Sequence, residues 1–132
     1  MEKTNKVKKI LLVDDNEMEL SLTEKVLNNE YEIIKAKSGK EALEYLLKGN
    51  VPNLILLDIL MPQLDGWGTY DRIRAITFLQ DVPVAFLTSV DESSKVDHAY
   101  EIGASDYILK PYNIKDLIIR IETIMNKYES QS

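Results

Sequence analysis

The chain has 132 residues and no cysteine, so it has room for one domain but not two, and it forms neither disulfides nor thiolate metal sites. Its composition, 45% hydrophobic and 29% charged, is that of an ordinary soluble globular protein, and we expect it in the cytoplasm. A net charge of −6 argues against direct nucleic-acid binding, and no apolar run approaches the ~18 residues of a membrane span.

The first half of the chain alternates predicted strands and helices. Two continuous apolar runs, residues 10–13 and 54–57, predict strands buried on both faces of a sheet. Residues 31–36 alternate only in part, which predicts a strand nearer a sheet edge. Helical periods run from residue 16 to about 28, and from the capping pair Ser38 and Glu41 to Gly49. The apolar side chains expected on the inner faces of these two helices are Met18, Leu20, Leu22, Val26, Leu27, Ala42, Leu43, Leu46 and Leu47.

The second half continues the alternation. Residues 82–87 and 107–109 predict a fourth and a fifth strand, and residues 95–102 predict a weak helix that ends at Gly103. Two clearer helices are expected, one after Gly66 and one from residue 114, followed by a frayed polar tail from residue 127. Their expected inner side chains are Trp67, Tyr70, Ile73, Ile76, Ile114, Leu117, Ile118, Ile121 and Ile124. We expect Arg72 and Arg74 on the outside, and also His98, the only histidine.

Five strands alternating with five helices predict right-handed strand–helix–strand units, and hence a parallel sheet covered on both faces. The predicted fold class is a doubly wound, flavodoxin-like α/β domain with strand order 2-1-3-4-5. Its topological switch point lies between the first and third strands. We expect this domain to span residues 8–128, with a basic N-terminal extension at 1–7 and a polar tail at 129–132.

Chemically distinctive residues follow four of the five predicted strands. Asp14 and Asp15 follow the first strand, Asp58 the third, Thr88 the fourth and Lys110 the fifth. Close carboxylates repel one another by about 4 kcal/mol per pair at an effective dielectric constant of ~20, so a positive group is needed among them. Oxygen ligands in this number, with room for water, suit Mg²⁺ better than Ca²⁺.

A metal ion, a lysine and a hydroxyl group around one carboxylate suit the handling of a phosphoryl group. Mg²⁺ and Lys110 would neutralise charge on the transferring oxygens, and Thr88 would donate a hydrogen bond. Asp58 would then attack phosphorus as a nucleophile and form an acyl phosphate.

Several separated motifs together resemble the receiver domain of two-component response regulators. They are Asp14-Asp15, residues 56–66 around Asp58, Thr88-Ser89, residues 103–107 and Lys110-Pro111. The resemblance covers roughly residues 8–128, nearly the whole chain, and the motifs agree with the family in order and spacing.

The resemblance implies a role for each acid. Asp58 would accept phosphate from a histidine kinase or a histidine phosphotransfer protein. Mg²⁺ would be bound by the carboxylates of Asp15 and Asp58, by Asp14 mostly through water, and by the backbone carbonyl of Leu60.

The resemblance also implies a switch and a phosphate-binding set. Thr88 and the following Ser89 would bind the phosphoryl group. The Thr88 hydroxyl would swing toward the phosphoryl group while the ring of Tyr107 turns inward. Lys110 would pair with the phosphate or with Asp58, and the bond before Pro111 would be cis. The face made by the fourth helix, fifth strand and fifth helix would change and control a protein target or an appended output domain. Phosphorylation-dependent dimerisation, the cognate kinase and the native length of the protein stay open.

Two positions depart from many relatives. Leu60, two residues beyond Asp58, and Val90, two beyond Thr88, are aliphatic and cannot orient a hydrolytic water. We therefore expect slow loss of phosphate, with a lifetime nearer hours than seconds.

Two other functions compete with the signalling switch, which is not an enzyme beyond its own phosphorylation and dephosphorylation. A Mg²⁺-dependent phosphatase with an aspartyl nucleophile usually carries a second acid two residues later, where this chain has Leu60. A flavodoxin-like cofactor binder needs a phosphate-cradling loop after the first strand, where Asp14 and Asp15 would repel phosphate unless a metal intervened.

Overall fold

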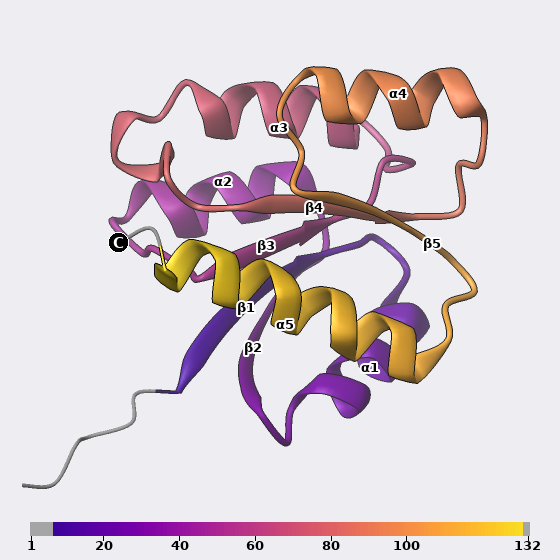
Figure 1. Cartoon of the computed structure of the whole chain (residues 1–132). Helices are drawn as coiled ribbons and strands as arrows, with labels where there is room; N and C mark the ends of the chain where they lie inside the picture. Colours follow the sequence, from indigo (N-terminus) through magenta and orange to yellow (C-terminus); the bar gives the residue numbers. More distant parts are fainter. Residues whose placement is uncertain (1–6, 131–132) are drawn as a thin grey trace, which may run out of the picture.

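The apolar runs of the sequence form one parallel sheet in the computed structural model, which describes residues 7–130 (Figure 1). The strands are β1 (Lys8–Val13), β2 (Tyr31–Ala36), β3 (Leu54–Leu57), β4 (Val84–Thr88) and β5 (Asp106–Leu109). Their order is β2-β1-β3-β4-β5, and every neighbouring pair is parallel. The predicted fold class and strand order are confirmed, and β2 is an edge strand as expected.

In the described part of the chain, four α-helices connect successive strands, a fifth follows β5, and together they cover both faces of the sheet. They are α1 (Glu17–Leu27), α2 (Gly39–Leu47), α3 (Gly66–Arg74), α4 (Ser93–Glu101) and α5 (Ile114–Ser130), with a short 3-10 turn, η1 (Thr77–Leu79), before β4. In Figure 1, α1 and α5 lie on one face of the sheet, and α2, α3 and α4 lie on the other. Within residues 7–130, no helix is both long and apolar enough to cross a lipid bilayer.

Alternate residues of each central strand enter different cores. In β1, Leu11 and Val13 pack beneath α2, α3 and α4, whereas Ile10 and Leu12 pack beneath α1 and α5. This division follows from the two-residue repeat of a strand, whose successive side chains point to opposite faces. A strand covered on both faces has no polar side, which is why β1 and β3 are continuous apolar runs.

The inner face of α1 differs from the predicted one. Met18 is 74% exposed and Leu22 is 55% exposed, while Leu20, Thr23 and Leu27 are buried. Both stripes fit a helical period, so the sequence pattern alone could not choose between them. The prediction was also wrong for Leu47 and Ile114, which point into solvent from the ends of their helices.

Two further expectations were wrong. Arg74 does not lie outside, because its guanidinium group donates hydrogen bonds to the carbonyls of Leu79, Gln80 and Val82, at 3.0, 3.3 and 2.6 Å, and closes the turn before β4. Helix α5 continues to Ser130, so the predicted polar tail at 129–132 begins inside a helix. Residues 1–6 of the predicted N-terminal extension and residues 131–132 of the tail lie outside the described part of the chain.

The segment after β3 is held against the sheet by close backbone contacts. The Asp58 N–H donates to the carbonyl of Val13 at 3.0 Å, which extends the pairing of β1 and β3 by one residue. Helix α3 then begins at Gly66, whose N–H donates to the carbonyl of Ile59 at 2.8 Å. A β-carbon at Gly66 would lie 2.3 Å from the Asp58 carbonyl oxygen and 2.6 Å from the Ile59 Cα. Only glycine therefore allows α3 to start this close to Asp58.

We expect Gly66→Ala to destabilise the fold by about 1–3 kcal/mol, the usual cost of overpacking, because its new methyl group meets backbone that cannot rotate away. The matched control is Gly68→Ala in the same helix. There the nearest atom is the flexible end of Leu64, at 2.8 Å, and alanine also favours the helix by about 1 kcal/mol. Urea denaturation of the three proteins measures both changes, and equal stability of the two variants would contradict the close-approach argument.

Candidate functional site

Three carboxylates meet at the carboxyl edge of the sheet. Asp14 and Asp15 follow β1 and Asp58 follows β3, its neighbour in the sheet. One carboxylate oxygen from each lies within 4.8 Å of the others. Asp14 and Asp58 are buried, whereas Asp15 is exposed to solvent. The sequence-based expectation that these acids converge is confirmed, and the donor set of three carboxylate oxygens fits a hard divalent cation.

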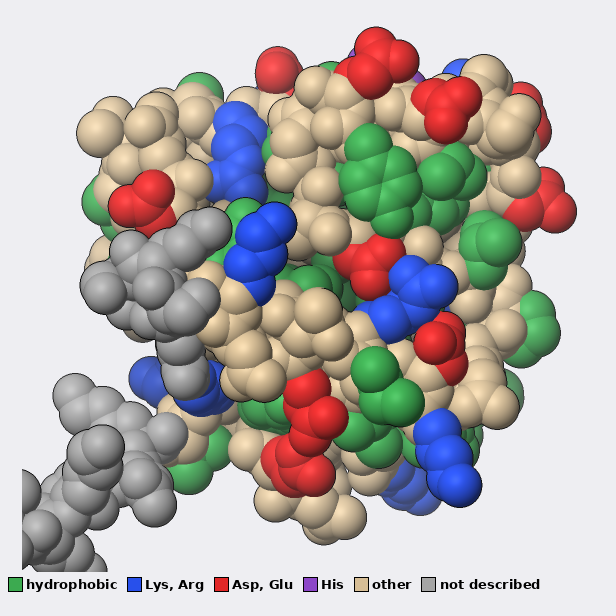
Figure 2. Space-filling view, viewed as in Figure 1, with side chains coloured by type: hydrophobic (Ala, Val, Ile, Leu, Met, Phe, Trp, Pro, Cys, Tyr) green, Lys and Arg blue, Asp and Glu red, His purple; other side chains and the backbone are tan. Residues whose placement is uncertain are grey.

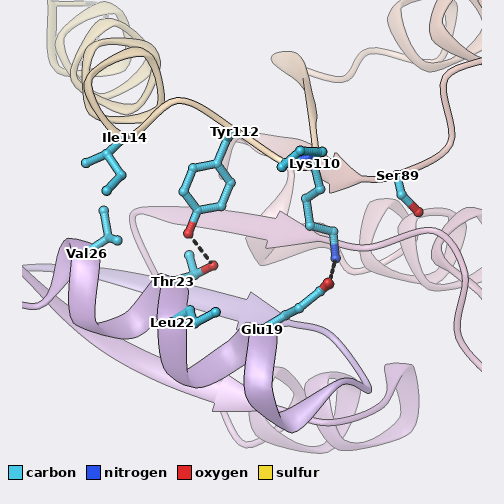
Figure 3. Close-up of a pocket in the computed structure, with 9 residues that line it drawn as sticks. Glu19, Leu22, Thr23, Val26, Ser89, Lys110, Tyr112 and Ile114 are labelled. Carbon is cyan, nitrogen blue, oxygen red and sulfur yellow. Dashed lines mark hydrogen bonds and ion pairs between the residues drawn. The ribbon is translucent and has the colours of Figure 1, made fainter.

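Lys110 brings a positive charge to the acids from the end of β5. Its Nζ lies 2.8 Å from Asp14 Oδ2 and 3.7 Å from Asp58 Oδ2, and it also contacts the Glu19 carboxylate (Figure 3). The lysine thus reaches the acids as expected, but its hydrogen bonds go to Asp14 and Glu19 rather than to Asp58. The peptide bond between Lys110 and Pro111 is cis, as the resemblance implied.

Asp58 is held in one orientation by its own neighbours. Its Oδ1 accepts a hydrogen bond from the Ile59 N–H at 2.8 Å, which leaves Oδ2 turned toward Lys110. Burial raises the pKa of Asp58. The positive charge of Lys110 and the hydrogen bond with the Thr88 hydroxyl offset this effect only in part, and the charge of Asp14 adds to it.

Lys110 stays charged in spite of its burial. Burial alone would lower its pKa, but the hydrogen bonds to Asp14 and Glu19, together with the charges of Asp58 and Asp14, raise it further than burial lowers it. The net pKa lies above the ordinary lysine value. The site therefore contains a permanent cation whose partners are all carboxylates.

The other predicted side chains surround these groups. Thr88 is wholly buried at the end of β4, beside Asp58. Tyr107 is buried, and its hydroxyl donates a 2.6 Å hydrogen bond to the carbonyl of Val90 in the loop after β4. Leu60 is 61% exposed, and Ser89 is also exposed. The structure thus brings Thr88 to Asp58 and turns the ring of Tyr107 inward, while Ser89 remains at the rim.

A groove of about 510 Å³ opens beside Lys110, between α1 and the start of α5. We call it the α1–α5 groove, and its lining includes Leu22, Thr23, Val26, Lys110, Tyr112 and Ile114. Figure 3 shows the hydroxyl groups of Thr23 and Tyr112 facing each other across it, 2.9 Å apart. The exposed apolar side chains of α1 therefore border the acidic site.

The sequence reasoning missed Glu19. Glu19 is not among the apolar residues of the predicted inner face of its helix, yet its carboxylate, 37% exposed, reaches Lys110. The signal available in the sequence is the helix start. The Asn16 side chain accepts the Glu19 N–H at 3.0 Å, which places Glu19 in the first turn, next to the acids that end β1. That position does not by itself indicate a partner 91 residues away.

In the absence of divalent cations, we expect Asp58→Asn to stabilise the protein at neutral pH. A carboxyl group whose folded-state pKa is raised costs stability when ionised, so removing its charge increases the free energy of unfolding, by about 0.5–2 kcal/mol, the usual range for a single stabilising substitution.

The gain should shrink as the pH falls through the raised pKa of Asp58 toward the ordinary aspartate value, because the wild-type carboxyl group is then protonated and uncharged in the folded state, and at lower pH in the unfolded state as well. Urea denaturation in EDTA at several pH values measures it. Asp65→Asn would not serve as a control, since Asp65 caps α3, whereas exposed Asp97 of α4 provides one as Asp97→Asn. A variant less stable than the wild type at neutral pH would contradict the dominance of burial.

Comparison with known proteins identifies the family. A family model described as the response regulator receiver domain matches residues 10–122. The "Probable transcriptional regulator ycf27" of Porphyridium aerugineum is 37% identical over 125 residues, which cover 94% of this chain and 50% of that protein. The chain thus spans about half the length of this relative.

Two solved structures are similar over almost the whole chain. A response regulator receiver domain protein from Clostridium thermocellum has a TM-score of 0.85 at 27% identity, and the alignment covers 96% of this chain and 100% of that one. The phosphorylated cyanobacterial phytochrome response regulator RcpA has a TM-score of 0.79 at 29% identity, over 96% and 97% of the two chains. Sequence and fold agree, and the chain belongs to the response regulator receiver domains of two-component signalling systems.

Proposed function

We propose that the chain is a phosphorelay switch in which Asp58 accepts a phosphoryl group from a phosphohistidine donor, with Mg²⁺ bound by the adjacent acids. The observation that carries the proposal is the convergence of Asp14, Asp15 and Asp58, two of which, Asp14 and Asp58, face the ammonium group of Lys110. A phosphorylated relative of similar fold, RcpA, supports it.

The geometry favours Oδ2 of Asp58 as the attacking atom, because Oδ1 already accepts the Ile59 N–H and Oδ2 faces Lys110. A bond forms between Oδ2 and phosphorus as the bond from phosphorus to the donor's histidine nitrogen breaks, and that nitrogen leaves with the electron pair. Lys110 would then donate to the phosphoryl oxygens, and Thr88 would donate from the side of β4.

Mg²⁺ in this proposal would be held by the carboxylates of Asp15 and Asp58, by Asp14 mostly through water, and by the carbonyl of Leu60. When bound, it would supply positive charge for the phosphoryl oxygens and offset the repulsion among the three acids. The exposure of Asp15 leaves the cluster open to a hydrated ion.

The output of the switch would be the face made by α4, β5 and α5. Tyr107 of β5 is tied through its hydroxyl to Val90, only two residues beyond Thr88. On the outer side, Asp106 accepts hydrogen bonds from Tyr100 of α4, at 2.9 Å, and from Arg120 of α5, at 2.7 Å. A shift of Thr88 toward a phosphoryl group would therefore reach all three elements through few contacts.

This face offers a surface for a protein partner or a second copy of the chain. Figure 2 shows acidic and basic side chains next to apolar ones on the side of the molecule that carries α5. Tyr100, Leu109 and Ile119 are exposed there among the charged groups. The name of the ycf27 relative suggests an output that acts on transcription, supplied by the half of that protein which this chain does not cover. A cytoplasmic location remains a prediction from the sequence.

The phosphodonor would dock at the α1–α5 groove. Exposed Leu22 of α1 and Ile114 of α5 border this groove, which opens beside Lys110. Met18 of α1 is exposed as well. A histidine kinase or a histidine phosphotransfer protein that covered these apolar side chains would bring its phosphohistidine to Asp58.

The competing function is a phosphatase with an aspartyl nucleophile. Such an enzyme usually carries a second acid two residues after the nucleophile, where this chain has Leu60. A switch should bind one phosphate per chain, whereas a phosphatase should release many.

We expect a small phosphodonor such as acetyl phosphate, with Mg²⁺, to add one phosphoryl group to the wild type, at the proposed attacking atom, Asp58 Oδ2. Asp58→Asn should show no adduct, and EDTA should abolish the adduct on the wild type. Intact mass spectrometry measures all three. Equal adducts on the wild type and Asp58→Asn, or none on either, would refute the proposal.

We also expect the phosphorylated chain to lose its phosphate slowly, with a lifetime nearer hours than seconds. Leu60 is exposed but aliphatic, and Val90 offers no polar side chain, so neither holds a water for attack on phosphorus. Leu60→Asn should shorten the lifetime, by roughly tenfold if the amide orients the attacking water through one hydrogen bond of about 1.4 kcal/mol. Leu60→Met is the apolar control, and decay is followed by mass after the donor is removed. A wild-type half-life of seconds would contradict this expectation.

A further inference from the structure

The ion pair between Glu19 and Lys110 links α1 to the end of β5. Glu19 is in the first turn of α1, and Figure 3 shows its side chain extended along the rim of the α1–α5 groove to meet the lysine. Lys110 is 11% exposed and lies among three carboxylates, those of Asp14, Glu19 and Asp58. Of these three, Glu19 alone comes from a helix rather than from the end of a strand.

The lysine has a limited number of donors, and two are in use. An ammonium group carries three N–H bonds. One is directed to Asp14 at 2.8 Å and one to Glu19, while Asp58 Oδ2, at 3.7 Å, is beyond hydrogen-bond distance. Glu19 and Asp14 together hold the ammonium group on the α1 side of the site, away from the oxygen that would carry phosphorus.

The two partners differ in what their release would cost. The Asp14 side chain is only 7% exposed, so without the lysine it would be a buried carboxylate with one positive partner fewer. Glu19 is 37% exposed, so water can replace the lysine at its oxygens. When the lysine moves toward a group on Asp58, Glu19 is therefore the partner that it leaves.

We propose that Glu19 is a positioning residue that competes with a phosphoryl group on Asp58 for Lys110, and so sets how strongly the site holds that group. This inference rests on the proposed function. Phosphorylation breaks the Glu19 pair and gains a lysine–phosphoryl contact, so the Glu19 pair lowers the affinity of the site for its own modification. The same exchange would release α1 from β5 at the rim of the groove where the donor docks.

The test uses beryllofluoride, a phosphoryl analogue, with Mg²⁺. Glu19→Gln keeps the side-chain shape but weakens the pair, so the analogue should bind about three- to tenfold more tightly, the range for one partly exposed charged hydrogen bond. The matched control is Glu17→Gln, which removes the same charge from the same helix but from a pair with Lys37. Dissociation constants come from NMR titration of each protein.

Two further measurements distinguish an effect of Glu19 on the position of Lys110 from an effect of its negative charge alone. In a Lys110→Met background, Glu19→Gln should not change the affinity, because the lysine through which Glu19 acts is gone. In the metal-free proteins, the side-chain ¹⁵N resonance of Lys110 should shift in Glu19→Gln and not in Glu17→Gln.

The outcomes are distinct. Tighter binding in Glu19→Gln alone, lost in the Lys110→Met background, supports the inference. Equal effects of Glu19→Gln and Glu17→Gln, or an effect that persists without Lys110, would overturn it, since charge alone would then explain the change. A wild type that binds the analogue, with Glu19→Gln unchanged, overturns this inference and leaves the proposed function standing. A wild type that neither binds the analogue nor accepts phosphate refutes both.

Discussion

The mutual repulsion of Asp14, Asp15 and Asp58 is the constraint on which the rest of the site depends. Three carboxylates within 4.8 Å are unfavourable unless a rigid frame holds them and a positive charge is near. The frame is the pairing of β1 with β3, two strands buried on both faces, extended by the hydrogen bond from the Asp58 N–H to Val13. Burial, with a smaller contribution from the charge of Asp14, raises the pKa of Asp58, so a cation at this edge is favourable.

Charge balance then explains the position of Lys110. It comes from the far edge of the sheet and pairs with Asp14 and Glu19, so its ammonium group lies beside the acids without bonding to Asp58. A cation that one partner can release and another can take suits the proposed phosphorylation of Asp58, which would change the charge of the site. The inward Tyr107, bonded to Val90, connects the same edge to the surface of α4, β5 and α5.

Most of the fold was predictable because its signals are local. Continuous apolar runs indicated buried strands, and alternation with helices fixed parallel order through the handedness of the connections. The helix faces were less predictable. Met18 and Leu22 have the spacing of a buried stripe but are exposed, since Leu20 and Leu27 form a second stripe that the sheet accepts instead. Arg74 looked like a surface charge, and only the turn that brings three carbonyls to its guanidinium group explains it.

The sequence by itself determined the architecture, the family and the set Asp14, Asp15, Asp58, Thr88 and Lys110, because parallel strands bring residues at their carboxyl ends to one edge. It could not determine which acid holds Lys110, that Glu19 joins the site, or that exposed apolar side chains of α1 border it. These features depend on the rotation of α1 about its axis and on contacts between residues up to 96 positions apart. Contacts between residues so far apart in the chain are not reflected in the periodicity of the sequence. Only the tertiary structure therefore determined these features of the site.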